Sequence, residues 1–231
     1  MTVIDISNLT FRWARQHADI LAIPQFTVQQ GEKVFLKGPS GSGKSTLLGL
    51  LSGISQPTSG EVSILGQKFS ELKATQRDTF RADHIGYIFQ MFNLLPYLSV
   101  LENVMLPCRF SSLRQQRIST SLEQEAKRLL TQLHLPHDCL HKPISELSIG
   151  QQQRVAAARA LMGQPELLIA DEPTSALDQN NREAFIELLM AECERSNTTL
   201  LFVSHDQTLE GLFDRTVALN DINTIHQEIT S

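Results

Sequence analysis

Short apolar runs alternate with segments of helical period along the C-terminal half of the chain. The apolar runs are four or five residues long, which is typical of buried strands, and the segments between them repeat apolar residues with the period of a helix. In chain order we predict a helix over 151–162, a strand over 167–170, a helix over 182–193 and a strand over 199–203. This alternation predicts an α/β fold with a mostly parallel sheet and helices on both of its faces.

The N-terminal part is predicted to be rich in strands. Apolar residues over 3–13 and 26–28 indicate two strands of an N-terminal sheet. A turn that contains proline and glycine precedes a further strand over 61–66. A buried strand over 33–36 leads through a glycine-rich loop into a helix over 45–51.

Helical spacing also marks the middle of the chain, from Leu98 to Leu135. The apolar residues that carry this period are Leu122, Ala126, Leu129, Leu130 and Leu133. We therefore predict an inserted α-helical subdomain at about residues 93–158, between strand-rich halves. Because the sequence contains no internal repeat or linker, residues 1–231 are expected to form a single domain.

The loop between the strand over 33–36 and the helix over 45–51 has the sequence pattern G-x-x-x-x-G-K-[ST], the Walker A motif or P-loop. Its glycines let backbone N–H groups turn inward around a phosphate, and the helix N-terminus adds partial positive charge. Lys44 can reach the β- and γ-phosphates, and the Ser45 hydroxyl can hold Mg²⁺. The residues predicted to bind the nucleoside triphosphate are Gly38, Pro39, Ser40, Gly41, Ser42, Gly43, Lys44, Ser45 and Thr46.

A second chemical signal is the pair Asp171 and Glu172 at the end of the strand over 167–170, the Walker B pattern. The carboxyl end of such a strand lies at the sheet edge where ligands of open α/β folds bind. We predict that Asp171 orients Mg²⁺ and that Glu172 polarises the attacking water. The alternative is an acidic pair that only begins a helix. Together with the P-loop, the pair predicts ATP hydrolysis.

Charge and cysteine content narrow the class of protein. The net charge of −5, from 20 basic and 25 acidic residues, argues against a nucleic-acid-binding protein. The cysteines Cys108, Cys139 and Cys193 are widely spaced and odd in number, which favours a reducing cytoplasmic setting. The N-terminal residues have no signal-peptide pattern, and no apolar run approaches the ~20 residues that cross a bilayer. A membrane-spanning part is therefore expected to come from another chain.

The segment Leu147–Gln151 resembles the LSGGQ signature of the ATP-binding cassette (ABC) ATPases. Other family motifs occur in the family's order. Gln90, after an apolar run over 85–89, resembles the Q-loop glutamine, and His205 resembles the switch histidine. Trp13 stands where the family places an aromatic residue that stacks on adenine.

The resemblance implies a role for each of these residues. Ser148, Gly150 and Gln151 would contact the γ-phosphate of ATP held by a second copy of the chain, so a head-to-tail dimer with two composite sites is expected. Gln90 would sense Mg²⁺ and the attacking water, and His205 would donate a hydrogen bond to the γ-phosphate. The alternatives are an ordinary serine N-cap, a turn glutamine and a structural histidine. For Trp13 the alternative is a core aromatic residue.

The resemblance also implies the architecture and the function. The fold would have a P-loop NTPase (RecA-like) core with an N-terminal antiparallel β-subdomain and the inserted helical subdomain. The chain would be the ATP-hydrolysing subunit that energises a membrane ABC transporter, bound to an integral-membrane permease at the cytoplasmic face of the inner membrane. The segment Phe89–Pro96 looks most like the lipoprotein-releasing and macrolide-exporting subgroup. An importer ATPase or a non-transporting complex of the cell-division type remains the alternative.

One residue departs from the family pattern. Ile149 occupies the third signature position, where the family has glycine. Isoleucine does not easily adopt a positive φ, and it adds bulk where two subunits would close. We therefore expect Ile149 to weaken closure of the dimer.

Overall fold

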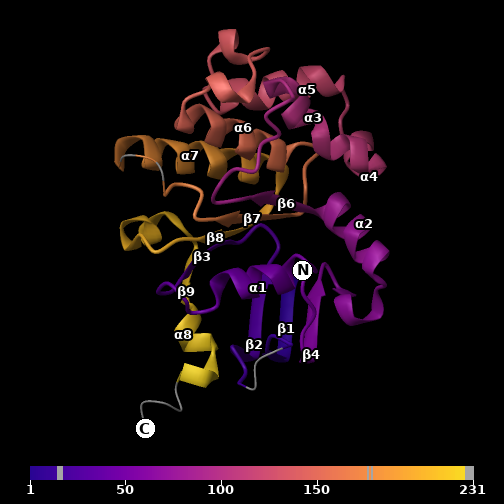
Figure 1. Ribbon diagram of the computed structural model, residues 1–231, viewed down its shortest axis with the longest axis vertical. Helices are drawn as coiled ribbons and strands as arrows, with labels where there is room; N and C mark the ends of the chain where they lie inside the picture. Colours follow the sequence, from indigo (N-terminus) through magenta and orange to yellow (C-terminus); the bar gives the residue numbers. More distant parts are fainter. Residues whose placement is uncertain (15–17, 176, 178, 227–231) are drawn as a thin grey trace. The chain divides into compact units, whose positions relative to one another are not determined.

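The computed structural model describes residues 1–14, 18–175, 177 and 179–226 (Figure 1). Contacts divide the chain into two units, each described separately below. The first unit comprises Met1–Arg81 and the chain from Leu201 onward, and the second comprises Ala82–Leu200.

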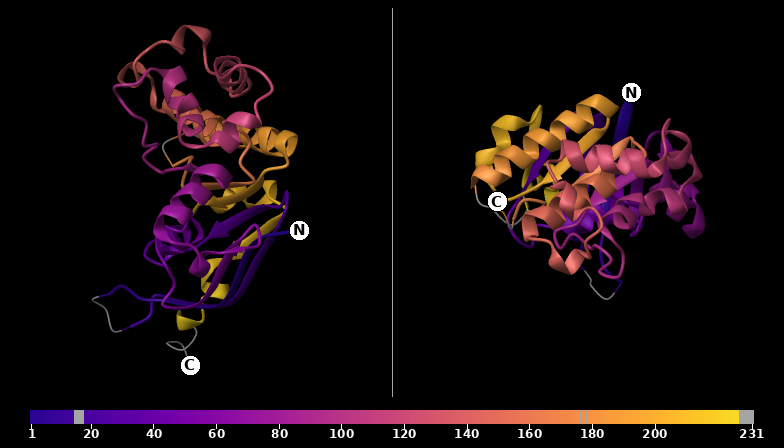
Figure 2. Two further views of the ribbon diagram at one scale, coloured as in Figure 1. Left: turned by 90° about the vertical axis from the view of Figure 1, so that its right-hand side faces the viewer. Right: turned by 90° about the horizontal axis from the view of Figure 1, so that it is seen from above.

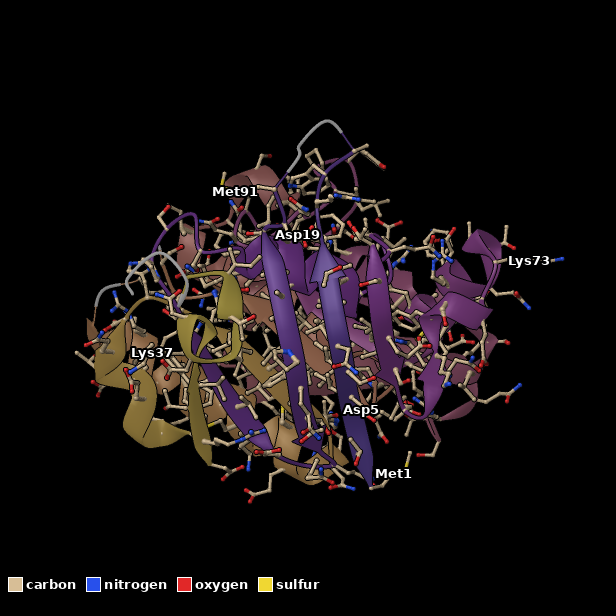
Figure 3. The ribbon with its side chains drawn as sticks, turned by 90° about the horizontal axis from the view of Figure 1, so that it is seen from below. Met1, Asp5, Asp19, Lys37, Lys73 and Met91 are labelled. Atoms are coloured by element: carbon tan, nitrogen blue, oxygen red, sulfur yellow. The ribbon has the colours of Figure 1, made fainter. Side chains whose placement is uncertain are left out.

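The first unit contains an antiparallel sheet of order β2-β1-β4-β5. Its strands are β1 (Thr2–Phe11), β2 (Leu21–Gln29), β4 (Ser59–Ile64) and β5 (Gln67–Lys68). In β1, buried Ile4 and Ile6 flank exposed Asp5, so one face of the sheet belongs to the core. Figure 3 shows Met1 at one end of this sheet and Asp19, just before β2, at the other.

The first unit also carries the glycine-rich loop, between β3 (Lys33–Lys37) and α1 (Lys44–Leu51). The strand β3 pairs in parallel with β9 (Arg215–Ala218), and α8 (Leu219–Ile222) follows β9. The backbone N–H of Ser204, just after β8 (Thr199–Val203), donates to the carbonyl of Leu36 in β3. The end of β3, where the glycine-rich loop begins, and the residues that follow β8 therefore lie close together.

The second unit contains the parallel pair β6 (Ile85–Ile88) and β7 (Leu167–Asp171). Its helices include α6 (Ile149–Leu161), which contacts β6, and α7 (Gln179–Ser196), which contacts α6. The parallel strands confirm the predicted α/β class with a mostly parallel sheet, and the sheet around β1 confirms the antiparallel N-terminal part.

The middle of the chain forms a group of helices in the second unit. They are α3 (Val100–Phe110), α4 (Ser112–Gln116) and α5 (Leu122–Gln132). Ser99 and Ser121 cap α3 and α5 through reciprocal bonds with the third residue of each helix. Because α3 and α5 pack on each other and on α6, the helices between residues 100 and 161 gather together, as both views of Figure 2 show. That they form a separate subdomain over about residues 93–158 stays a prediction.

A charged cluster holds β7 to the segment before β6. Glu166 accepts hydrogen bonds from Arg117, at 2.5 and 3.0 Å, and lies 3.2 Å from Nδ1 of His84, the last residue of α2 (Ala74–His84). Burial alone would raise the pKa of Glu166, but the bonds from His84 and Arg117 outweigh it and lower that pKa from 4.5 to about 2. The carboxylate is thus more stable ionised in the folded chain than in the unfolded chain.

We expect this cluster to make stability depend on pH in the acid range. A lowered folded-state pKa gives stability that is fully present above the unfolded value near 4.5 and is lost as the pH falls toward about 2. At pH 7, Glu166→Gln should therefore unfold at a lower urea concentration than the wild type, and the difference should shrink as the pH approaches 2. Glu187→Gln, on the exposed side of α7, is the control. A pH-independent difference for Glu166→Gln would contradict the ionic contribution.

Candidate functional site

The glycine-rich loop has the backbone that phosphate binding requires. Gly41 and Gly43 have φ values of 80° and 100°, which side chains with a Cβ rarely adopt. Gly43 is also the N-cap of α1, and an added Cβ there would lie 2.9 Å from Leu21 of β2. Both the φ value and the nearby Leu21 side chain therefore favour glycine at Gly43, directly before the N-terminus of α1, where backbone N–H groups can bind an anion.

Polar groups inside the loop fit a phosphate. Within the described residues, the buried Oγ of Ser42 has no hydrogen-bond partner. A Cβ on Gly38 would lie 2.7 Å from this oxygen, so Gly38 leaves the space that Ser42 uses. The Nζ of Lys44 donates to the carbonyls of Gly38, at 2.6 Å, and Pro39, at 3.0 Å. The ammonium thus lies across the loop, and the exposed Ser45 is the second residue of α1.

The structure brings His205 to the start of this loop. A pocket of about 290 Å³ is lined by residues from both segments: Lys37, Gly38, Pro39, His205, Gln207, Ala218 and Asn220. His205 is exposed, and Asp206 is the N-cap of the short 3-10 helix Gln207–Leu212. The Nζ of Lys37 lies 3.0 Å from a carboxylate oxygen of Glu210, which holds that charge on one side of the pocket. Pro39 and His205, which are 166 positions apart in sequence, therefore line the same pocket.

Trp13 lies just beyond β1 and is 47% exposed. Its ring meets Phe11 edge-on, with centroids 4.9 Å apart, and Phe11 is buried. Of the two aromatic residues, Trp13 therefore has the surface that could stack on a base, while Phe11 belongs to the core. Adenine stacking by Trp13 stays a prediction.

In the second unit, the ends of β6 and β7 bring Gln90 close in register to the acidic pair. Ile88 pairs with Ala170, so Asp171 and the residues after Ile88 leave the same edge of the parallel sheet. Gln90 is exposed in the turn that follows. Burial and then the negative charge of Asp171 raise the pKa of Tyr87 on β6. The predicted metal residues Gln90 and Asp171 are thus neighbours by topology.

Glu172 has a strained backbone. Its φ is 47°, in the left-handed region that is uncommon for residues with a side chain. Its carbonyl accepts a hydrogen bond from Ser175 at 3.2 Å, and the following Pro173 and Thr174 are buried. Such strain costs of order 1–3 kcal/mol and is concentrated at functional sites. Ala176 and Asp178, further along the segment that follows Glu172, lie outside the described residues.

The signature segment forms the N-terminus of α6. Ser148 is the N-cap: its Oγ accepts from the N–H of Gln151 at 3.3 Å, and Oε1 of Gln151 accepts from the N–H of Ser148 at 2.9 Å. The serine therefore caps the helix, as the alternative interpretation had it, and its exposed hydroxyl proton stays able to donate to an anion. Gly150 has room for a Cβ within this chain, because the nearest atom, in Leu177, would be 3.5 Å away.

The argument that the position of Ile149 requires a positive φ is wrong. Ile149 is the first residue of α6, and it is absent from the positive-φ residues among those described. The backbone there follows the helix and does not need glycine. The side chain is 54% exposed, so an effect on dimer closure would come from its bulk alone.

Sequence reasoning missed the side chains that hold the segment after Gln90. Asn103 of α3 and Arg159 of α6 are buried and hydrogen-bond to backbone groups of residues 92–99. The signal was a polar residue inside each apolar helical pattern, which indicates a buried partner but does not identify it.

Comparison with known proteins gives the family. The profile described as "ABC transporter" matches residues 21–175. The lipoprotein-releasing system ATP-binding protein LolD of Hydrogenovibrio crunogenus is 40% identical over 221 residues, which cover 95% of this chain and 94% of that protein. The uncharacterized ABC transporter ATP-binding protein YbbA of Escherichia coli is 43% identical, over 87% of this chain and 86% of YbbA.

Comparison with solved structures indicates the same family. A dimeric ATP-binding cassette, MJ0796, in a post-hydrolysis state bound to ADP and Pi, has a TM-score of 0.83 at 35% identity, covering 94% of each chain. The chain belongs to the ABC transporter family and is one of its ATPase subunits, with ATP as substrate, Mg²⁺ as cofactor and the P-loop NTPase fold. Its structural neighbours include dimers.

Among the described residues, none of the helices combines the length and apolar character needed to span a bilayer.

Proposed function

We propose that the chain is the ATPase subunit of a lipoprotein-releasing ABC transporter, bound to its integral-membrane permease at the cytoplasmic face of the inner membrane. The observation that carries the proposal is the 40% identity with the LolD subunit of Hydrogenovibrio crunogenus across nearly the whole of both chains. Two further LolD proteins, from Syntrophotalea carbinolica and Psychrobacter arcticus, are 39% and 42% identical.

The surface after Gln90 supports a protein partner. Met91 and Tyr97 are 80% and 78% exposed, and they flank a segment whose backbone is anchored from below. Figure 3 shows Met91 at the surface. Exposed methionine and aromatic side chains on a fixed backbone suit a partner's apolar helix. We assign this surface to the permease.

Within the ATPase, we propose a head-to-tail dimer in which each ATP lies between the P-loop of one copy and the signature helix of the other. Lys44 and the loop N–H groups hold the phosphates, Ser45 and Asp171 hold Mg²⁺, and Mg²⁺ supplies charge that offsets the phosphate oxygens. Gln90 orients the water, Glu172 polarises it, and His205 donates to the γ-phosphate. The exposed Ser148 hydroxyl and the α6 N-terminus meet the partner's nucleotide.

Reconstitution tests the transport proposal. The chain is combined with a multispanning permease of the lipoprotein-releasing type, and the complex is placed in proteoliposomes that carry a radiolabelled triacylated lipoprotein. We expect ATP-dependent release of the label into the soluble fraction when a lipoprotein-binding acceptor is present. The matched control is the same complex with Glu172→Gln. A wild-type complex that hydrolyses ATP but releases no lipoprotein would instead favour another cargo or a non-transporting complex.

A further inference from the structure

The segment that follows Gln90 has an unusual backbone. Phe92 and Asn93 are consecutive residues with φ values of 59° and 49°, although neither is glycine. The N–H of Asn93 donates to the carbonyl of Met91 at 2.6 Å, which closes a tight three-residue turn around the left-handed Phe92. Strained backbone of this kind persists only where surrounding groups hold it.

Arg159 is the group that holds this turn. Its Nη1 donates to the carbonyl of Asn93 at 2.6 Å, and its Nη2 donates to the carbonyl of Phe92 at 2.5 Å. The side chain is only 9% exposed, and burial lowers the pKa of Arg159. The planar guanidinium presents two N–H groups side by side, so it can bond two consecutive carbonyls at once.

The same segment is anchored a second time from α3. Asn103 is fully buried; its Oδ1 accepts from the N–H of Leu95, and its Nδ2 lies 3.0 to 3.2 Å from the carbonyls of Leu95, Leu98 and Ser99. This amide fixes the far end of the segment, whereas Arg159 fixes the end next to Gln90. The exposed Gln90 therefore lies directly before a segment whose backbone is held at both ends by hydrogen bonds from Arg159 and Asn103.

The helix that supplies Arg159 is also the one that Ser148 caps, so one element, α6, joins the signature to the turn after Gln90. We propose that Arg159 is a positioning residue that, through the carbonyls of Phe92 and Asn93, holds Gln90 in place for ATP hydrolysis. The inference rests on the role proposed above for Gln90. It makes the orientation of α6 and the conformation of the Gln90 turn depend on each other.

Two variants on α6 test the anchoring directly. Arg159→Lys keeps the charge but cannot bond both carbonyls in the same geometry. Arg154→Lys is the matched control, because Arg154 lies on the same helix and its Nη1 donates to the carbonyl of Leu133, away from the Gln90 turn. In amide hydrogen exchange of the nucleotide-free protein, residues 89–98 should exchange at least about tenfold faster in Arg159→Lys than in the wild type or in Arg154→Lys.

Kinetics test the action through Gln90. Arg159→Lys should lower kcat on the order of tenfold, because a misplaced group costs rate, and change KM for ATP by less than about twofold. In a Gln90→Ala background, Arg159→Lys should lower kcat by less than about twofold further, since residues that act together are not additive. Arg159→Gln, which keeps one donor without a buried charge, takes its place if the lysine variant does not fold.

The possible outcomes separate the anchoring of the turn by Arg159 from its action through Gln90, and separate both from the proposed function. Unchanged exchange over residues 89–98 in the Arg159 variants would overturn the anchoring, whatever the activity. A full additional tenfold loss of kcat in the Gln90→Ala background would overturn positioning through Gln90 and leave Arg159 a purely structural residue. If the wild-type chain hydrolysed no ATP, the proposed function would fail, and exchange alone would decide whether Arg159 holds the turn.

Discussion

Lys44→Ala is expected to lower ATPase activity by at least about a hundredfold, because it removes the charge that opposes the β- and γ-phosphates in the proposed site. Among the described residues, the Lys44 ammonium donates to two carbonyls of its own loop, those of Gly38 and Pro39. The side chain is half-buried, so its loss should change the stability of the free protein little. An ATPase assay measures the loss of activity, and thermal unfolding with and without Mg-ATP measures the stability and the binding of nucleotide.

The wild-type melting temperature should rise with Mg-ATP, since a ligand that binds the folded state stabilises it, and that of Lys44→Ala should not. Lys73→Ala is the matched control, because Lys73 is an exposed lysine of the same unit (Figure 3). Wild-type turnover in Lys44→Ala, or an undiminished rise of its melting temperature with Mg-ATP, would refute the assignment of the phosphate site to this loop.

The buried strands of the fold could be predicted from local sequence. The strand over 199–203 is observed with the predicted bounds, because five consecutive buried residues give an apolar run that stands out from its surroundings. The strand over 26–28 was predicted too short, since β2 extends from Leu21 to Gln29. Its first residues are fixed by pairing with β1, in which Phe11 lies opposite Leu21, and not by an apolar run.

The helix α2 was missed for a different reason. None of its residues is buried, so Ala74–His84 has no apolar period to read. The helix is held instead by arginines that donate to carbonyls at the end of α1: Arg77 to Gly53 at 3.2 Å and Arg81 to Ser52 at 3.1 Å. Cations at a helix C-terminus are favourable, but their partner lies more than twenty residues away in sequence. A pattern within one segment cannot reveal such a contact.

The candidate site also has parts that local sequence predicts and parts that depend on distant contacts. The P-loop is a local motif that its glycine spacing identifies, and two of those glycines, Gly41 and Gly43, have positive φ values. The left-handed conformation of Phe92 could not be predicted, because the bond to its carbonyl comes from Arg159 of α6, and no local pattern indicates the same conformation at Glu172. The role of Arg159 depends likewise on two carbonyls 66 and 67 residues earlier. Strained positions and their anchors thus became visible only in the folded chain.

Glu172→Gln is expected to lower turnover on the order of a hundredfold or more, because it removes the carboxylate that polarises the attacking water. Glutamine is as long as glutamate and meets the same backbone strain at φ 47°, so the change isolates the charge. Since hydrolysis lets the proposed dimer open, the variant should also accumulate as an ATP-bound dimer. Gel filtration with light scattering, with and without Mg-ATP, measures this state.

Glu183→Gln makes the same chemical change at an exposed position on α7, and it should keep wild-type turnover and the wild-type elution volume. Adding Lys44→Ala to Glu172→Gln should abolish the ATP-dependent dimer, because the nucleotide that joins the two copies no longer binds. The combination therefore separates a dimer held by ATP from one held by protein contacts alone. A Glu172→Gln protein that stays monomeric at saturating ATP and hydrolyses it at the wild-type rate would exclude both the role of Glu172 and the two-site dimer.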